Sequence, residues 1–588
     1  MTSHPSPETL EKIHQARTVN GRPPEDRLID LPHFGDLLDR RAAEYAHKTF
    51  LIHYDEAGNR EEVSYSELNR AVNKSANYLS KELGVGRGDR VATIGYNHSD
   101  LVIISFACWK LGAVVAPQNI AEDDQRINFI LRNSQSVVLL VRFDYLARAA
   151  QIVAGEDEHL EPVDNVRQIV QVGGDPSAAY PHFQTEIEKQ RDAWEAPEQV
   201  RLDDEALLVY TSGTTGAPKG VVLMQYNMLV DALGIAEWHG ITADQRMMCV
   251  LPIHHVNGII VTLVTPLLVG GSTVLNFRYS SSHFWERIAK EQVQIVSVVP
   301  TLLQFSLEYA DKAAAEGRSI WGEGVSAEDL GAFRHFICGA GTLAVGLATT
   351  FEERFKMKIV HGYGLSESTC YSCFLPPDLD WETHREWMSA HNYPSIGVPI
   401  HPNEMAIFDA TGSGTQLGPG ERGEICIRGH NIMKYYFLRP DVNDETFKFG
   451  WFRSGDEGFY LTDDQDRPFF FITGRIKELI NRGGVKFSPF DIEEVLLEIP
   501  GIHTGLAIGF ENDSYGEEVG AYVVLEEGVE VKPEEILAYC RERMTFEKSP
   551  KVVVFGTDIP VTSTGKYQRL KLRDRFAEHK SVQFRPEG

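Results

Sequence analysis

Short apolar runs alternate with helix-like segments along most of the chain. An apolar run covers 91–95, Ser99 can cap a helix-like stretch over 101–111, and 113–116 is apolar again. Strand, helix and strand in this order are typical of a parallel sheet. Further strand-like runs beside helical segments cover 137–141, 295–299, 333–337 and 358–360. The pattern predicts an α/β fold whose large N-terminal body consists of open α/β sheet layers, with ligands at the strand ends.

The character of the sequence changes near residue 474. Ser488 can cap a helix that begins with Pro489, and this helix has one apolar face, formed by Ile492, Val495, Leu496 and Ile499. Strand-like runs follow at 505–509, 520–525 and 552–555. We therefore predict an N-terminal domain over 1–474 and a small, mobile α+β C-terminal domain over 475–588.

Composition narrows the classes of function. The 588 residues, 43% of them hydrophobic, can bury more than one core. A formal net charge of −27 without a lysine or arginine block argues against nucleic acid and anionic membranes as partners. Seven scattered cysteines indicate a reducing compartment, and we expect the lone pair Cys370 and Cys373 to be inert. The first residues lack the apolar region of a signal peptide, so we expect a cytoplasmic protein.

Residues 211–220, with the sequence TSGTTGAPKG, form a hydroxyl- and glycine-rich loop with one lysine. Glycines allow a tight turn whose amide groups approach an anion, and the hydroxyl groups are further donors. Lys219 adds a mobile positive charge. The spacing differs from that of the common P-loop, in which Gly-Lys is followed by Ser or Thr and then a helix. The loop is predicted to hold a polyphosphate.

Four further segments occur in a recognisable order. They are HGYGLSE at 361–367, WFRSGD at 451–456, GRIK at 474–477 and IPVTSTGK at 559–566. Together with the phosphate loop they resemble the motifs of the AMP-forming adenylate enzymes, which include acyl-CoA synthetases, adenylation domains and luciferases. The resemblance extends over about residues 60–570, and it implies an acid–thiol ligase.

The resemblance also implies roles for particular residues. ATP, Mg²⁺ and coenzyme A would be the cofactor and co-substrates, with Glu367 as the metal ligand and with Lys219 and Lys566 as cations at the phosphates. Lys566 would bridge the acid and the α-phosphate. The other positions that would contact the nucleotide are Thr211, Ser212, Gly213, Thr214, Thr215, Gly216, Gly339, Ala340, Gly341, Gly362, Tyr363, Gly364, Ser366, Asp456 and Arg475. Among these, Tyr363 would stack on adenine opposite the wall at 339–341, and Asp456 would accept the ribose hydroxyls beside Arg475.

The acid would bind near residues 251–258, LPIHHVNG, which resemble a stretch of the family in which His255 lines the pocket. His254 replaces the usual aromatic residue and makes this place more polar. The candidate pocket residues are His254, His255, Val256, Asn257, Arg334, His335 and Cys338. The sequences of several segments are most similar to those of oxalate–CoA ligase-like members of the family. We therefore expect a short polar or dianionic acid, such as oxalate, malonate or sulfoacetate. A fatty or aromatic acid stays open, and Arg334 is equally suited to a structural ion pair.

In the family, the small domain swings between the two half-reactions. Lys477 occupies the hinge position, and Arg482, Gly483 and Gly484 would line the tunnel for the pantetheine arm after the swing. Two rival functions remain at this point. The chain can be an adenylation enzyme that loads a carrier protein, although no carrier domain follows Lys566, or a nucleotide-binding module without catalysis.

Overall fold

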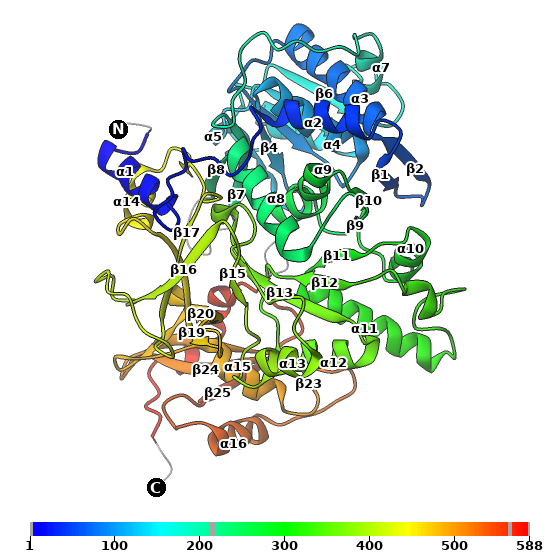
Figure 1. Ribbon diagram of the computed structural model, residues 1–588. Helices are drawn as coiled ribbons and strands as arrows, with labels where there is room; N and C mark the ends of the chain where they lie inside the picture. The colour runs from blue at the N-terminus through cyan, green and yellow to red at the C-terminus, as the bar shows by residue number, and fades with distance from the viewer. Residues whose placement is uncertain (1–3, 212–217, 562–566, 586–588) are drawn as a thin grey trace.

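The computed structural model describes residues 4–211, 218–561 and 567–585. It has a large body with two mainly parallel sheets, a four-stranded antiparallel sheet, and a C-terminal unit with a sheet of its own (Figure 1). The α/β fold predicted from the sequence is confirmed. The helices are α1 (Pro7–Ala16), α2 (Phe34–Glu44), α3 (Tyr65–Asn77), α4 (Ser99–Leu111), α5 (Asp124–Asn133), α6 (Leu146–Ala154), α7 (Phe183–Glu188), α8 (Gln225–His239), α9 (Thr265–Val269), α10 (Phe284–Lys290), α11 (Pro300–Ala315), α12 (Val345–Phe355), α13 (Trp381–Ser389), α14 (Pro440–Thr446), α15 (Pro489–Leu497) and α16 (Pro533–Arg543).

The first sheet has seven strands and lies in the upper part of Figure 1. Its order is β18 (Tyr435–Tyr436), β8 (Lys219–Met224), β7 (Glu205–Thr211), β4 (Val114–Gln118), β3 (Arg90–Ile94), β5 (Val138–Arg142) and β6 (Gln168–Val172). β7 and β8 pair antiparallel, with Thr211 opposite Lys219. The phosphate-loop sequence therefore joins the two strands of a hairpin, and Lys219 begins the returning strand.

The second sheet has nine strands. Its order is β15 (Val398–Pro399), β14 (Cys373–Phe374), β13 (Lys358–Tyr363), β12 (His335–Cys338), β11 (Ile295–Val298), β9 (Arg246–Cys249), β10 (Ser272–Asn276), β1 (Thr49–Tyr54) and β2 (Arg60–Ser64). The strands from β13 to β1 are parallel neighbours. Parallel strands are buried on both faces, which explains their nearly continuous apolar runs.

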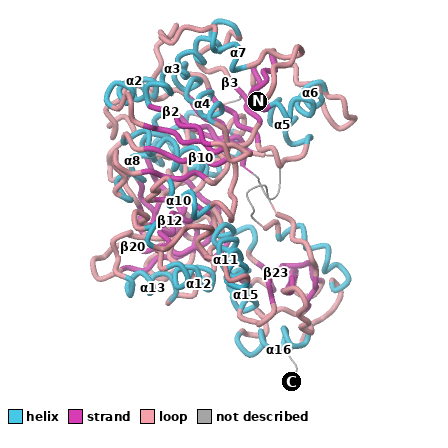
Figure 2. Tube along the Cα trace, turned by 90° about the vertical axis from the view of Figure 1, so that its right-hand side faces the viewer, coloured by secondary structure: helices cyan, strands magenta, loops and turns pink. Residues whose placement is uncertain are grey.

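The third sheet is antiparallel, in the order β16 (Asn403–Phe408), β17 (Gly423–Gly429), β19 (Phe452–Thr462) and β20 (Pro468–Arg475). The fourth contains β22 (Val485–Phe487), β21 (Ile480–Arg482), β24 (Gly516–Leu525) and β23 (Ile502–Asn512), with β25 (Val552–Phe555) beside β24. The chain leaves the third sheet after Arg475 and enters the fourth at Ile480, whose side chain belongs to a separate apolar core. Figure 2 shows α15, α16 and β23 in a unit beside the body.

Two local predictions can be compared directly with the structure. Ser488 caps α15, because its hydroxyl accepts a hydrogen bond from the amide of Phe490, and Pro489 is the first helical residue. All seven cysteines are buried and free, Cys370 and Cys373 among them. No helix within the described residues has the length and apolar character that crossing a bilayer requires.

Candidate active site

The carboxyl ends of β12 and β13 bring two of the motifs together. The strands run parallel with Cys338 beside His361, so residues 339–341 and Tyr363 leave the sheet at the same edge. A side chain at Gly339 would place its Cβ 2.6 Å from the hydroxyl of Tyr371 and 2.9 Å from the carbonyl oxygen of Gly362. Only glycine fits at position 339, so this part of the predicted wall presents backbone without a side chain.

Three polar side chains meet beside this wall. Asp456 on β19 pairs with Arg475 on β20, and Arg475 Nε lies 3.5 Å from Asp456 Oδ1. The hydroxyl of Tyr363 donates a hydrogen bond of 2.6 Å to Oδ2 of the same carboxylate. Asp456 raises the pKa of Arg475, while burial and Asp456 raise the pKa of Tyr363 well above its ordinary value. Arg475 therefore stays cationic and Tyr363 stays a donor, which fixes the carboxylate as an acceptor.

Glu367 and Lys219 come together through a strand pairing that the sequence motifs do not contain. The short strand β18 pairs with β8, with Tyr436 opposite Val221. Tyr436 donates a hydrogen bond of 2.7 Å to Glu367 Oε1, and the Lys219 ammonium lies 4.6 Å from the centre of the Tyr436 ring. Glu367 is only 6% exposed. The sequence motifs do not include Tyr436. Its position in a short aromatic run before Pro440 could have indicated a short strand.

Positive charge accumulates around Lys219 although the whole chain is strongly acidic. Burial lowers the pKa of Lys219, Glu367 opposes this shift, and Lys477, Arg439 and Arg475 lower the pKa further. Arg439 was also missed in the sequence analysis. Lysine and arginine charges that repel one another around one carboxylate are stabilised when a polyanion binds between them. The place suits the phosphates of a nucleotide.

Several predicted positions of the phosphate machinery lie outside the described residues. These are Ser212, Gly213, Thr214, Thr215, Gly216 and Lys566. Thr211, which is described, donates a long hydrogen bond of 3.5 Å to the carbonyl oxygen of Lys219. Ser366 and Glu367 belong to one turn of 3₁₀-helix, Ser366–Ser368. Gly364 precedes it, and a Cβ there would overlap the carbonyl oxygen of Cys370.

A polar chain adjoins Gly339 through the Tyr371 hydroxyl. Ser297 on β11 donates a hydrogen bond of 2.6 Å to Asn257 Oδ1, and Asn257 Nδ2 donates one of 3.2 Å to the Tyr371 hydroxyl. Asn257 begins a π-helix, Asn257–Val264, just after the two histidines. Tyr371 was not among the predicted pocket residues. It lies between Cys370 and Cys373, and only the two cysteines of this segment gave rise to a prediction.

The two predicted pocket histidines are neighbours in space as well as in sequence. The rings of His254 and His255 lie 4.3 Å apart, centre to centre. His254 Nε2 is buried and forms no hydrogen bond with the described residues. Burial and the neighbouring His255 hold the pKa of His254 well below its usual range. The neutral imidazole of His254 thus has a ring nitrogen available to a ligand.

The other candidate pocket residues are distributed along β12. Arg334 precedes this strand, and its guanidinium donates to the carbonyl oxygens of His239 and Gly240 at the C-terminal end of α8. His335 begins the strand and shares a 2.9 Å hydrogen bond with His239. Both lie at the strand end opposite Cys338, whose fully buried thiol has a pKa raised by burial. The structure therefore does not bring Arg334 or His335 to the nucleotide edge, which corrects their prediction as acid ligands.

The predicted hinge and tunnel residues follow β20. Lys477 is exposed in a 3₁₀ turn, Ile476–Glu478, and lies close enough to lower the pKa of Lys219. Gly483 and Gly484 form the tip of the hairpin between β21 and β22, with φ of 60° and 93°. Arg482 is turned into the C-terminal core and is bonded to Glu518.

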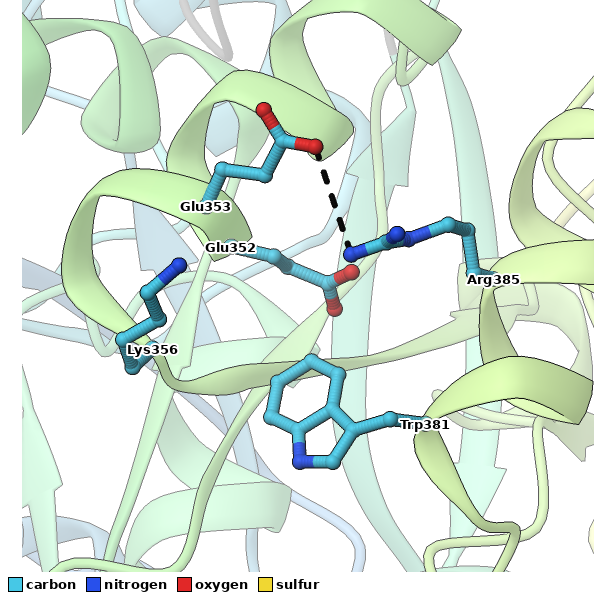
Figure 3. Close-up of a pocket in the computed structure, with 5 residues that line it drawn as sticks. All are labelled: Glu352, Glu353, Lys356, Trp381 and Arg385. Carbon is cyan, nitrogen blue, oxygen red and sulfur yellow. Dashed lines mark ion pairs between the residues drawn. The ribbon is translucent and has the colours of Figure 1, made fainter.

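A hollow of about 260 Å³ lies elsewhere, between α12 and α13 (Figure 3). Its lining comprises Glu352, Glu353, Lys356, Trp381 and Arg385. Arg385 forms a long ion pair of 4.0 Å with Glu353. Glu352 accepts hydrogen bonds from His384 and from the amide of Ile359, near the amino end of β13. The hollow shares no residue with the motifs, and we assign no chemistry to it.

Comparison with known proteins identifies the family. The sequence pattern of the AMP-binding enzyme family matches residues 38–437, and that of the AMP-binding enzyme C-terminal domain matches 491–566. The chain is similar to an oxalate–CoA ligase of Arabidopsis thaliana, at 30% identity over 88% of this chain and 94% of that protein. It is also similar to a feruloyl-CoA synthase of an Amycolatopsis species, at 31% identity over 91% of this chain and 98% of that one.

The fold has a solved counterpart. The crystal structure of ATP-bound MatB from Rhodopseudomonas palustris matches with a TM-score of 0.79 and 23% identity, covering 93% of this chain and all of that one. That likeness concerns the fold, whereas the sequence matches concern the class of enzyme. The chain belongs to the AMP-binding enzyme family and is an acid–CoA ligase of the AMP-forming type.

Proposed function

We propose that the protein activates a short polar carboxylic acid with ATP and transfers the acyl group to coenzyme A. In the first step a carboxylate oxygen of the acid attacks the α-phosphorus of ATP, and pyrophosphate leaves. In the second the CoA thiol, which loses its proton, attacks the acyl carbon, and AMP leaves. The observation that carries the proposal is the meeting of Lys219, Glu367 and Asp456, through Tyr436, Tyr363 and Arg475, at the ends of strands in the body.

The carboxylate of Glu367 suits Mg²⁺. It is a hard oxygen donor held in a fixed orientation by Tyr436, and it lies in a cluster of cations where a polyphosphate would bind. Mg²⁺, when bound there, would offset the charge of the phosphate oxygens. Glu367 is nearly fully buried, so its carboxylate would destabilise the fold if no cation lay nearby.

The remaining residues bind and orient the nucleotide. Asp456 accepts hydrogen bonds from the ribose hydroxyls, while Arg475 and Tyr363 hold its carboxylate in place. Lys219 approaches the phosphates from the start of β8. Lys566, which lies outside the described residues, supplies a second ammonium group near the α-phosphate. Positioning and charge neutralisation of this kind account for most of the rate gained in phosphate chemistry.

The packing behind Gly339 supports a short acid. Tyr371, Phe374, His239 and His335 form a continuous row between the sheet and α8, with ring centres 4.3, 4.5 and 5.0 Å apart. All four side chains are buried. A fatty or aromatic acid that extended from Gly339 along α8 would have to displace this row. We place the acid beside Gly339, with the Tyr371 hydroxyl as the limit of its site.

The groups at that boundary support a polar acid. Asn257, Ser297 and Tyr371 form one hydrogen-bonded chain, and His254, three residues before Asn257 in the sequence, has a buried Nε2 that forms no hydrogen bond with the described residues. The relatives named above act on acids as different as oxalate and ferulate, so their names do not select one. A dianionic acid would require a cation at the boundary. Asn257, Ser297 and Tyr371 are uncharged at this boundary, so we expect them to contact a neutral polar group of the acid.

The test is a panel of acids with ATP and Mg²⁺, followed by pyrophosphate release and AMP formation with and without CoA. Glycolate and lactate represent short polar acids, oxalate and malonate dianionic acids, and octanoate and ferulate long ones. We expect CoA-dependent AMP formation to be fastest with the first pair. Acid-dependent pyrophosphate release without a CoA thioester would instead indicate an enzyme that loads a carrier protein, and no turnover at all would indicate a binding module.

A further inference from the structure

The turn at Gly483-Gly484 is attached to the rest of the C-terminal unit by a hydrogen bond at its base, and the space around its tip at Gly484 is open. Both glycines have positive φ, as a tight two-residue hairpin requires. The amide of Gly483 donates a hydrogen bond of 2.8 Å to the carbonyl oxygen of Tyr515. A Cβ added to Gly484 would meet nothing within 4 Å, and Val485 beside it is 55% exposed. The tip therefore offers a narrow backbone surface with an apolar side chain beside it.

A buried ionic network lies directly beneath this turn. Arg482 Nε donates a hydrogen bond of 2.7 Å to Glu518 Oε1. Lys551 Nζ lies 3.5 Å from the same oxygen and donates a hydrogen bond of 2.5 Å to the carbonyl oxygen of Phe546. The side chains of Arg482, Glu518 and Lys551 are 7%, 0% and 1% exposed, so this is a core feature rather than a surface pair.

The network carries two positive charges and one negative charge. Aromatic rings stabilise the excess positive charge. The Arg482 guanidinium lies 3.8 Å from the centre of the Tyr515 ring, and the Lys551 ammonium lies 4.5 Å from that of Phe546. Such contacts stabilise a desolvated cation. Burial is the largest influence on Lys551 and lowers its pKa to about 8.

Tyr515 connects the network to the turn. Its ring covers Arg482, and its carbonyl oxygen accepts the Gly483 amide. Arg482 is itself the last residue before the two glycines and pairs with Gly516, the residue after Tyr515. A change in Glu518 would leave the buried Arg482 guanidinium without its carboxylate partner, directly beside the residues that attach the turn. The side chain of Arg482 thus points into the C-terminal core and not toward the tip of the turn. The sequence had predicted that Arg482 lines a tunnel for the pantetheine arm.

We propose that Glu518 and Lys551, acting through Arg482 and Tyr515, are positioning residues that set the shape of the Gly483-Gly484 turn for the passage of the CoA thiol arm. The inference rests on the proposed function. The network lies within the C-terminal core, apart from Glu367, Asp456 and Lys219. We therefore expect a change in the network to affect thioester formation and to leave adenylation largely unchanged.

The two half-reactions separate this role from a general effect on folding. Glu518→Gln removes the charge that holds both cations and keeps the shape of the side chain. With the best acid of the panel, we expect KM for CoA to rise about tenfold or more and thioester formation to slow, while acid-dependent ATP–pyrophosphate exchange stays within about twofold of the original rate. The matched control is Glu511→Gln, because Glu511 forms an exposed ion pair with Lys580 in the same unit. This control should change neither half-reaction.

Two further variants keep the test decisive if Glu518→Gln does not fold. Tyr515→Leu removes the aromatic ring over Arg482 but leaves the ion pairs of Arg482 and Lys551 with Glu518. Like Glu518→Gln, it should slow thioester formation and leave ATP–pyrophosphate exchange largely unchanged. Lys551→Arg keeps the charge and should retain more thioester formation than Lys551→Met. Equal loss of exchange and thioester formation in these variants, or no loss in either, would overturn the inference. Failure of the unmodified enzyme to form a thioester with any acid would instead overturn the proposed function on which the inference rests.

Discussion

The hydroxyl of Tyr436 donates a hydrogen bond to Oε1 of Glu367 across 2.7 Å. These residues are 69 positions apart, and they are brought together by the pairing of β18 with β8 and by a hydrogen bond of 2.8 Å from the amide of Met433 to the carbonyl oxygen of Glu367. Lys219 lies over the same tyrosine ring. Tyr436 therefore orients the proposed metal ligand and faces the lysine of the phosphate loop.

Replacing Tyr436 by phenylalanine should slow adenylation. A hydrogen bond to a charged group contributes about 1.5–3 kcal/mol, so we expect a loss of about 10- to 100-fold in the rate of ATP–pyrophosphate exchange. Tyr435→Phe is the matched control, since the hydroxyl of Tyr435 is bonded to Glu205 rather than to Glu367. Equal effects of the two changes would contradict the role given to Tyr436.

Asp456→Asn should weaken the recognition of ribose. An amide carries one oxygen instead of two and bears no charge, so it accepts fewer hydrogen bonds from the two hydroxyls and loses its attraction to Arg475. We expect kcat/KM for ATP to fall about tenfold or more. Comparison with 2′-deoxy-ATP is the sharper measurement: the original enzyme should prefer ATP, and the variant should lose most of that preference. A preference that survives intact would place the ribose elsewhere.

The buried pair His239 and His335 should make stability depend on pH. Burial, with Arg334 and Lys358 nearby, lowers the pKa of His335 to about 3, whereas an unfolded histidine has a pKa of about 6.5. Between these values the unfolded chain binds the additional proton, so the free energy of unfolding falls as pH falls. One such histidine contributes about 2 kcal/mol of loss from pH 6.5 to pH 5.

This contribution can be measured by urea unfolding at pH 7 and at pH 5. His335→Gln should lower the stability at pH 7, where its hydrogen bond with His239 is lost, but it should also make the decline toward pH 5 shallower. The exposed His159 provides the control, because His159→Gln removes a histidine without a buried partner. An unchanged slope in His335→Gln would show that His335 is not neutral in the folded protein.

Lys566→Ala should separate the two half-reactions in the opposite sense to Glu518→Gln. We expect acyl-adenylate formation to be abolished, because the ammonium group near the α-phosphate is lost. Thioester formation from supplied acyl-adenylate should stay largely intact. Lys571→Ala, a nearby change, should affect neither. Equal loss of both half-reactions in Lys566→Ala would contradict a swing of the C-terminal domain about Lys477.

The sequence predicted six strands of the two mainly parallel sheets, β3, β4, β5, β11, β12 and β13, because strands buried on both faces appear in the sequence as apolar runs. It also identified Tyr363, Asp456 and Arg475, which the structure brings together. It could not reveal Tyr436, since its contact depends on a two-residue strand joining distant segments. Arg334 was a candidate because an arginine can receive a second anionic group of the acid, but the structure does not place it beside Cys338. The two occupy opposite ends of β12, and the free carbonyl groups at the end of α8 take up the guanidinium.

The row of rings behind Gly339 gives the last prediction, which concerns the length of the acid. Tyr371→Ala should open a cavity where the Tyr371 ring now contacts Phe374, 4.3 Å between ring centres. Loss of a large buried ring lowers stability by about 3–5 kcal/mol, and it also removes the partner of Asn257. If the row limits the acid, octanoate should gain activity in this variant while glycolate loses it. Phe408→Ala, which also removes a buried ring but outside the row, should lower stability without extending the range of acids. Activity with octanoate that is already high in the original enzyme, or that does not rise in Tyr371→Ala, would show that the acid takes another path from Gly339.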